Sequence, residues 1–108
     1  MKGPVLSITP PSEKAVIVLK AMANARRLQI LCLLHERELS VGELCAELIL
    51  SQSALSQHLA WLRRDGLVTT RRESQTVFYS LHSEEVKALI ELLHRLYCNL
   101  EQDYPRST

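Results

Sequence analysis

The apolar residues of the chain recur at the spacing of an α-helix in five segments. Residues 84–101 give the clearest pattern, because their apolar positions return every three or four residues from Val86 to Leu100. Residues 13–23 are apolar nearly all round, which favours a helix that is buried on more than one side. The pattern predicts helices over residues 13–23, 25–37, 41–48, 51–64 and 84–101.

Residues with short polar side chains stand before these helices, where they can cap free backbone N–H groups. Ser40, with Glu43 three residues later, has the form of a capping box. The segment 49–51, in which the fourth helix already begins near Ser51, leaves almost no room for a loop, so the third and fourth helices must turn sharply into each other, as in a helix-turn-helix. The other candidate caps are Ser12, Asn24 and Ser83.

After the helix stop expected at Gly66, β-branched and aromatic residues form the runs "LVTTRR" and "TVFYSL". The polar residues 73–75 separate the two runs, which together predict a β-hairpin. The expected fold is mainly α with a small β-hairpin, a winged helix-turn-helix in the order α-α-α-α-β-β-α. Residues 1–11 hold three of the four prolines and predict an irregular, flexible arm. Residues 12–102 are expected to form one domain, and residues 103–108 a short polar tail.

Length and composition narrow the class of protein. A chain of 108 residues predicts one domain, and 13 Lys and Arg against 12 Asp and Glu leave a formal charge of +1, so any basic surface must be local. No apolar run reaches the length of a membrane span, and the N-terminus lacks a signal-peptide pattern, so we expect a cytoplasmic protein that does not enter a membrane. The three cysteines include no C-x-x-C pair, which argues against a disulfide scaffold.

The predicted helix over residues 51–64 has an unusual polar face. At about 100° per residue, Leu55, Leu59 and Leu62 fall opposite a sector of short polar side chains, one alanine and two arginines. Such a face is usually just solvated, but the preceding turn and the following hairpin favour an entry into the major groove of DNA. There Gln can pair with adenine, Ser with several bases, and Arg with guanine or phosphate. The expected contacts are Gln52, Ser53, Ser56, Gln57, Arg63 and Arg64.

The predicted hairpin adds positive charge to the same region. Between residues 51 and 81, four arginines stand against two acidic residues. Arg71, Arg72, Ser74 and Gln75 are expected at the tip of the wing, where they can reach phosphates or a minor groove. A hairpin loop that is merely solvated is an equal alternative.

Two larger side chains of the predicted recognition helix are not expected to contact bases. His58 falls nearer the apolar side, so we interpret it as a packed, hydrogen-bonded histidine. Trp61 lies on the flank of the apolar stripe. We interpret it as packing, because a protein that reads a duplex needs no base-stacking platform.

Four stretches, "ANARRLQILCLL", "ELSVGELCAEL", "LSQSALSQHLAWLRRDGLV" and "QTVFYSL", resemble the ArsR/SmtB family of winged-helix transcriptional regulators, over residues 13–98. The resemblance implies a homodimer that is paired through its first and last helices and binds an inverted repeat. It is strongest to a branch that activates hemolysin genes by displacing a silencing nucleoid protein, which implies an activator of virulence genes. The apolar residues expected at the dimer interface are Val16, Leu19, Leu89, Leu93 and Leu96.

Departures from the family argue against a metal site. Many relatives bind metals through two cysteines in the stretch that reads "ELSVGELC" here, where Ser40 and Gly42 take those positions and only Cys45 remains. Soft metals require several converging thiolates or imidazoles, so we interpret Cys45 as core. The positions of a second family site, on the last helix, are occupied by Glu84, Val86, Tyr97 and Leu100. We expect no metal and no cofactor.

Cys32 and Cys98 are candidates for a redox switch, since redox-responsive members of the family carry one cysteine in the second helix and one near the end of the last. A disulfide, a sulfenic acid on Cys32 alone and two independent buried cysteines all remain open. A reactive pair requires that at least one thiol be partly exposed and shifted toward thiolate.

The sequence thus favours a dimeric regulator with double-stranded DNA as its partner. A winged helix used for protein contact is one alternative, and a small thiol enzyme is another. The enzyme is disfavoured because no base stands beside either candidate cysteine in the sequence and a chain of this length leaves little room for a substrate pocket. We therefore expect no enzymatic activity.

Overall fold

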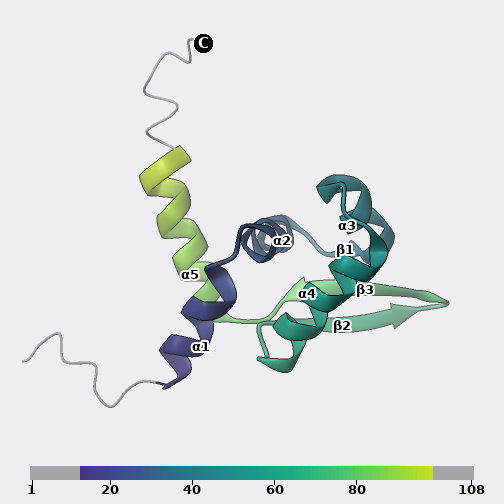
Figure 1. Cartoon of the computed structure of the whole chain (residues 1–108), viewed down its shortest axis with the longest axis horizontal. Coiled ribbons are helices and arrows are strands. Elements are labelled where there is room, and N and C mark those ends of the chain that lie inside the picture. The colour runs from purple at the N-terminus through teal and green to yellow at the C-terminus, as the bar shows by residue number, and fades with distance from the viewer. Residues whose placement is uncertain (1–12, 99–108) are drawn as a thin grey trace, which may run out of the picture.

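The computed structural model describes residues 13–98, which form a mainly helical fold with a small sheet (Figure 1). The predicted order of helices and hairpin is confirmed. The helices are α1 (Glu13–Met22), α2 (Ala25–Glu36), α3 (Val41–Leu48), α4 (Gln52–Arg64) and α5 (Glu84–Leu93), and a π-helical turn, η1 (His94–Cys98), continues α5. The strands are β1 (Leu39–Ser40), β2 (Val68–Glu73) and β3 (Thr76–Leu81).

The predicted caps begin the helices that they precede. The Ser40 hydroxyl accepts the Glu43 N–H at 3.1 Å, and the Glu43 carboxylate accepts the Ser40 N–H at 2.8 Å, so both halves of the capping box are formed. The Asn24 side chain accepts the N–H groups of Arg26 and Arg27, each at 3.0 Å, and Ser83 caps α5 in the same manner. Ser12, the arm over residues 1–11 and the tail over residues 103–108 lie outside the described residues.

The turn between α3 and α4 is as tight as the sequence requires. Ile49 ends α3 in the left-handed conformation, with φ 53° and ψ 52°, and donates its N–H to the Cys45 carbonyl at 2.9 Å. Ser51 then caps α4 by accepting the Ala54 N–H at 3.1 Å. The helix-turn-helix is therefore closed by hydrogen bonds of the chain itself.

The sheet has three strands in the order β1-β3-β2, all antiparallel. The hairpin was predicted but β1 was not, because two residues are too few to show an alternating pattern. Leu39 and Thr70 pair with Tyr79 from opposite sides, which puts the three side chains on one face of the sheet. Leu39 is fully buried, so this inner face of the sheet covers the core.

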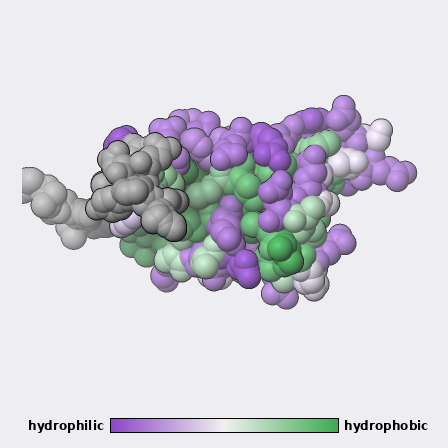
Figure 2. Space-filling model, turned by 90° about the horizontal axis from the view of Figure 1, so that it is seen from above, coloured by the Kyte–Doolittle hydropathy of each residue, from purple (hydrophilic) through white to green (hydrophobic). Residues whose placement is uncertain are grey.

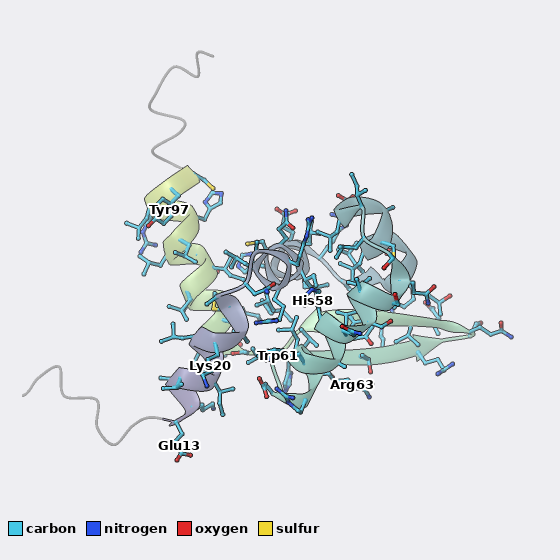
Figure 3. The ribbon with its side chains drawn as sticks, viewed as in Figure 1. Glu13, Lys20, His58, Trp61, Arg63 and Tyr97 are labelled. Atoms are coloured by element: carbon cyan, nitrogen blue, oxygen red, sulfur yellow. The ribbon has the colours of Figure 1, made fainter. Side chains whose placement is uncertain are left out.

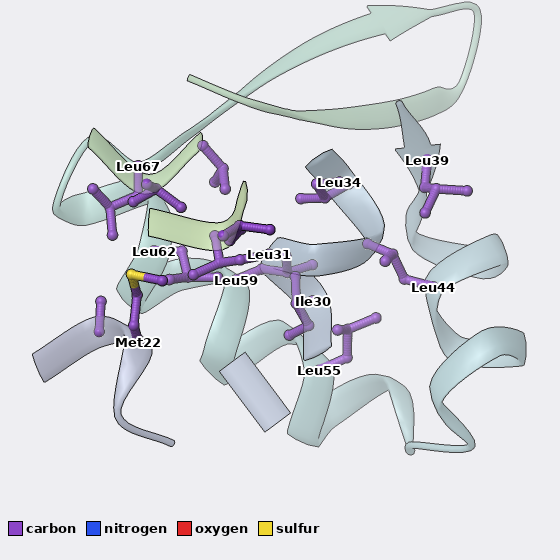
Figure 4. Packing of buried hydrophobic residues seen from close by; sticks show 14 of the residues in the cluster. Met22, Ile30, Leu31, Leu34, Leu39, Leu44, Leu55, Leu59, Leu62 and Leu67 are labelled. Carbon is purple, nitrogen blue, oxygen red and sulfur yellow. The ribbon is translucent and has the colours of Figure 1, made fainter. Parts of the chain in front are cut away.

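Apolar side chains from all five α-helices meet in one core, where Ile30 and Leu31 of α2 pack beside Leu55 and Leu59 of α4 (Figure 4). Fully burying one such side chain stabilises a fold by about 1.5 to 3 kcal/mol. The predicted burial of α1 on more than one side is wrong for the single chain. Only one stripe of α1 is buried, and Val16, Ile17 and Leu19 remain exposed.

The last helix stands apart from the hairpin. In Figure 1, α1 and α5 lie on one side of α2 and the hairpin extends from the other. The predicted helix over residues 84–101 changes to π-helical hydrogen bonding at His94, and residues 99–101 lie outside the described residues. None of the described helices has the length and apolar character needed to cross a membrane.

Candidate nucleic-acid interface

The polar face of α4 lies on the surface, because the opposite stripe of Leu55, Leu59 and Leu62 is buried in the core. The separation follows from helical geometry, since residues three and four apart share a face. The exposed side of α4 offers two amides, two hydroxyls and two guanidinium groups around one alanine. These residues are Gln52, Ser53, Ser56, Gln57, Ala60, Arg63 and Arg64.

Local contacts hold both ends of this face. At the N-terminal end, the hydroxyls of Ser51 and Ser53 lie 3.3 Å apart. At the C-terminal end, Arg64 Nε donates to the Asp65 carboxylate at 3.2 Å, so part of its charge is offset. Arg63 lies on the flank of α4 that faces away from α1 and α2 (Figure 3). A charged side chain on the flank of a helix that lies in a DNA groove can reach a phosphate beside that groove.

A cleft of about 350 Å³ lies beside α4. Ser56, Ala60, Arg63 and Arg64 of α4 line one side, and Tyr79 of β3 lines the other. The cleft joins the recognition helix to the wing and combines apolar walls with two positive charges. The sequence analysis did not predict that Tyr79 lines a cleft with α4, because the pattern of a strand does not show which of its faces meets the helix. A phenol at this place can donate a hydrogen bond to a phosphate oxygen.

The wing presents its arginines differently from what we expected. Ser74 and Gln75 form the turn itself, while Arg71 and Arg72 lie within β2. Neighbouring residues of a strand point to opposite faces, so the two arginines have different surroundings. Arg72 and Gln75 are exposed, whereas the Arg71 guanidinium is bound to Glu38 at 2.8 Å. Arg71 therefore lies within β2 and is paired with Glu38, not at the tip of the wing, while its contact with phosphate stays a prediction.

His58 and Trp61 lie on the side of α4 that faces α1 and α2 (Figure 3). The Arg27 guanidinium stacks on the Trp61 ring, 3.7 Å from its centroid, so Trp61 packs within the protein as predicted. Arg27 is only 6% exposed and donates to the carbonyls of Ala21 at 2.9 Å and Lys20 at 3.2 Å. His58 is half-buried, and this burial lowers its pKa, with the charges of Arg27 and Arg26 lowering it further.

Comparisons with known proteins agree with this geometry. The family described as bacterial regulatory protein, arsR family, matches residues 24–70. The transcriptional activator HlyU of Vibrio cholerae serotype O1 is 76% identical over 91 residues, which cover 84% of this chain and 84% of that protein. This chain belongs to the ArsR family. It is therefore a DNA-binding transcriptional regulator, and the alternative of a thiol enzyme is excluded.

Solved structures of ArsR-family proteins confirm the winged helix-turn-helix fold. HlyU from Vibrio cholerae N16961 superposes with a TM-score of 0.80 at 75% identity, over 84% of this chain and 99% of that one. Reduced HlyU from the same organism superposes with a TM-score of 0.76 at 79% identity, over 79% of this chain and 90% of that one.

The two candidate cysteines of this ArsR-family chain open into the same cavity. Cys32 of α2 and Cys98 of η1 line a mostly apolar space of about 710 Å³ between α2 and α5. Both residues are exposed, as a reactive pair requires. Burial of the Cys32 thiol, followed by the neighbouring Cys98 and Glu36, raises its pKa, so Cys32 does not show the shift toward thiolate that a reactive pair requires of at least one of its thiols. His35 bridges the same two helices through the Glu91 carboxylate at 3.1 Å.

Large apolar side chains are exposed along α1 and the C-terminal end of α5 and η1. Among the predicted interface residues, Val16, Leu19 and Leu96 are exposed, whereas Leu89 and Leu93 are half-buried against the core. In Figure 2 hydrophobic residues run through the middle of the molecule, while the tip at the hairpin end is mostly polar. The sequence reading missed three further exposed residues, Ile17, Leu92 and Tyr97.

Within residues 13–98, the His, Cys, Asp and Glu side chains do not gather in a group of three that could hold a metal ion. Cys45 is half-buried and packs against the core, in agreement with its interpretation. The position is thus explained by packing alone.

Proposed function

We propose that the protein acts as a homodimer on an inverted repeat, with one α4 in each of two successive major grooves and the wings beside them. The observation that carries the proposal is the exposed polar face of α4 together with the cleft that continues it to Tyr79. An α-helix fits the major groove, and helices paired by a two-fold axis read half-sites about 34 to 36 Å apart.

Dimer formation through α1 and α5 is supported by their exposed apolar residues. Val16 and Leu19 are 51% and 57% exposed, and Leu96 is 46% exposed, which is costly for side chains of this kind in water. Large apolar side chains that gather on exposed helix faces are a mark of protein interfaces. The second copy would cover the stripe of α1 that this chain leaves open.

We propose activation as the direction of regulation. The 76% identity to a protein named as a transcriptional activator supports activation by this chain. We propose that it raises the transcription of virulence genes of the hemolysin type, in the cytoplasm, by displacing a silencing nucleoid protein from overlapping DNA. A winged helix used mainly for protein contact would not need the base-reading side chains of α4.

Cys32 and Cys98 are proposed to tune DNA binding through oxidation. In the reaction, the two thiols lose their S–H protons and two electrons to hydrogen peroxide, whose O–O bond breaks to give two water molecules, and a sulfur–sulfur bond forms. The supporting observation is that both thiols open into the cavity between α2 and α5. A bond between these helices would alter how α5 places the second subunit, and so the spacing of the two α4 helices.

The base-reading role of α4 is tested by Gln57→Ala. One bidentate base contact contributes roughly 1 to 3 kcal/mol of discrimination, so binding to the promoter upstream of the protein's own gene should weaken roughly fivefold to more than a hundredfold. Binding to a random duplex of equal length should change little. Fluorescence anisotropy at fixed salt measures both.

Gln29→Ala is the matched control, because Gln29 is also an exposed glutamine but belongs to α2. It should bind both duplexes as the wild type does. An equal loss of both duplexes with Gln57→Ala would contradict base reading and leave only a positioning role for that residue.

A further inference from the structure

Arg71 lies on the outer face of the three-stranded sheet. Its partner across the hairpin is Phe78, whereas Thr70 and Leu39 pair with Tyr79, the residue that lines the cleft beside α4. Since adjacent strand residues alternate between faces, Arg71 points away from the face that holds Tyr79. By the same alternation, Arg72 points to the Tyr79 side.

The Arg71 side chain crosses the sheet to reach Glu38. Nε and Nη2 donate to the two Glu38 oxygens, each at 2.8 Å, and the guanidinium lies 4.6 Å from the centroid of the Phe78 ring beneath it. Glu38 stands in the short segment between α2 and β1, while Arg71 belongs to β2 at the far edge of the sheet. The contact therefore joins the two outer edges across the central strand.

Further contacts complete this bridge. Ser80 donates its hydroxyl to Glu38 at 3.1 Å, and the remaining Arg71 nitrogen, Nη1, lies 3.5 Å from the Glu73 carboxylate. The hydrogen bond from Arg71 lowers the pKa of Glu38, so this carboxylate stays charged at neutral pH. One guanidinium thus stands between two carboxylates, which is an unfavourable place for a phosphate.

β3 is attached to the part of the chain before α3 through β1 and through its contacts with α2, whereas β2, which carries Arg71, makes few contacts with that part. β1 pairs with β3 through only Leu39 and Ser40, and β2 has no strand on its outer side. An exposed ion pair usually contributes little, but a bidentate geometry that is backed by a ring and a third hydrogen bond belongs to the stronger class.

We infer that Arg71 is a positioning residue of the wing, which fixes the direction of the hairpin through Glu38, and that Arg72 on the opposite face contacts the phosphates. The inference rests on the proposed function in one respect, namely that the wing touches DNA. Removing an acidic residue from a DNA-binding surface ordinarily strengthens DNA binding, but the opposite is expected at Glu38. Loss of Glu38 should weaken DNA binding, although it removes a negative charge.

The test measures the affinity and salt dependence of DNA binding, with the promoter upstream of the protein's own gene as the probe. Glu38→Gln and Arg71→Lys should each weaken binding by up to about fivefold, because Lys keeps the charge but cannot form the fork. The double variant should be no weaker than either single one. Arg72→Gln should flatten the salt dependence by up to about one unit.

Glu73→Gln is the matched control, since it removes the same charge from the wing but only the weaker, 3.5 Å contact with Arg71. It should leave binding unchanged or strengthen it. Tighter binding by Glu38→Gln, or unchanged binding by Arg71→Lys, would overturn the inference.

A measurement without DNA separates this inference from the proposed function. Amide hydrogen exchange in β2 and β3 should be faster in Glu38→Gln than in the wild type, because the hairpin is less firmly attached. Unchanged exchange would overturn the bridge itself. If exchange is faster but Arg72→Gln has no effect on DNA binding, the bridge stands and the proposed contact of the wing with DNA fails.

Discussion

Ile49 combines two unfavourable features at the turn of the helix-turn-helix. Its φ of 53° lies in the left-handed region, where the Cβ of an L-residue crowds the backbone, and its side chain is 88% exposed. A β-branched side chain is especially poor in this conformation. The backbone at this residue is fixed by the short connection between α3 and α4, not by the preference of isoleucine.

We therefore expect Ile49→Gly to stabilise the protein by about 1 kcal/mol, since glycine adopts positive φ without strain and little apolar burial is lost. Ile49→Ala keeps a Cβ and should recover much less of this free energy. Urea unfolding followed by circular dichroism measures both variants. A lower stability of Ile49→Gly would show that the exposed isoleucine makes a contact that strain alone does not reveal.

Cys32 reacts through its thiolate, and its raised pKa makes that form scarcer than in a free cysteine. The rate of its alkylation by iodoacetamide should therefore rise at a higher pH than the rate of a model thiol. Glu36→Gln removes one of the neighbouring charges that raise the pKa, so it should move the profile to lower pH. Peptide mass spectrometry resolves Cys32 from the other cysteines.

Glu84→Gln, an exposed change of the same kind at the start of α5, serves as the control and should leave the profile of Cys32 where it is. If Cys32 is alkylated at lower pH than a model thiol, the surroundings of the cavity activate the thiol in a way that burial does not explain.

At the scale of elements, Arg27 ties three helices together. It begins on α2, donates to the last carbonyls of α1, and stacks on Trp61 of α4. The buried cation is stabilised there because helix carbonyls at a C-terminus carry partial negative charge and an aromatic face attracts cations. The proposed dimerisation helix and the recognition helix are thus held by one side chain.

Arg27→Ala should destabilise the protein by roughly 1 to 3 kcal/mol, because the carbonyls of Ala21 and Lys20 lose their donor. Trp61 is the only tryptophan, so its emission reports on the contact directly and should shift to the red as water reaches the ring. Arg27→Lys keeps the charge without the fork and should give a smaller shift. An unchanged emission would show that the stack does not persist in solution.

The helices could be predicted from the sequence because periodicity and caps are local signals. Asn24, Ser40 and Ser83 each act at the helix that they precede. β1 and the role of Tyr79 could not be predicted, since both depend on which strand lies beside which. Likewise, nothing in the sequence near Arg71 points to Glu38, which stands 33 residues earlier.

The same limit applies to the predicted apolar residues of α5 and η1. Leu89, Leu93 and Leu96 share one helical stripe, yet the first two pack against the core and only the third is exposed. Periodicity marks the apolar side of a helix, but tertiary packing decides which part of that side another subunit could cover.

At the scale of the whole molecule, two surfaces of different character lie at separate ends. The polar face of α4 and the hairpin lie to one side of α2, and the apolar stretches of α1 and α5 lie to the other (Figure 1). The cavity with both thiols lies between α2 and α5. A change in how α5 sits on α2 would therefore act on the proposed dimer interface before it acts on the DNA-binding face.

The dimer is tested by Leu19→Glu and Leu96→Glu, which place a charge on each of the two exposed apolar stretches. Both side chains are exposed in the single chain, at 57% and 46%, so the substitutions should spare its core while making a buried interface unfavourable. We expect monomers by sedimentation velocity, with operator affinity reduced at least about tenfold because a single α4 reads only one half-site.

Ile49→Glu is the control, since Ile49 is more exposed than either leucine but lies outside α1, α5 and η1. It should remain a dimer. Dimers of Leu19→Glu and Leu96→Glu with full operator affinity would show that the subunits pair through another surface.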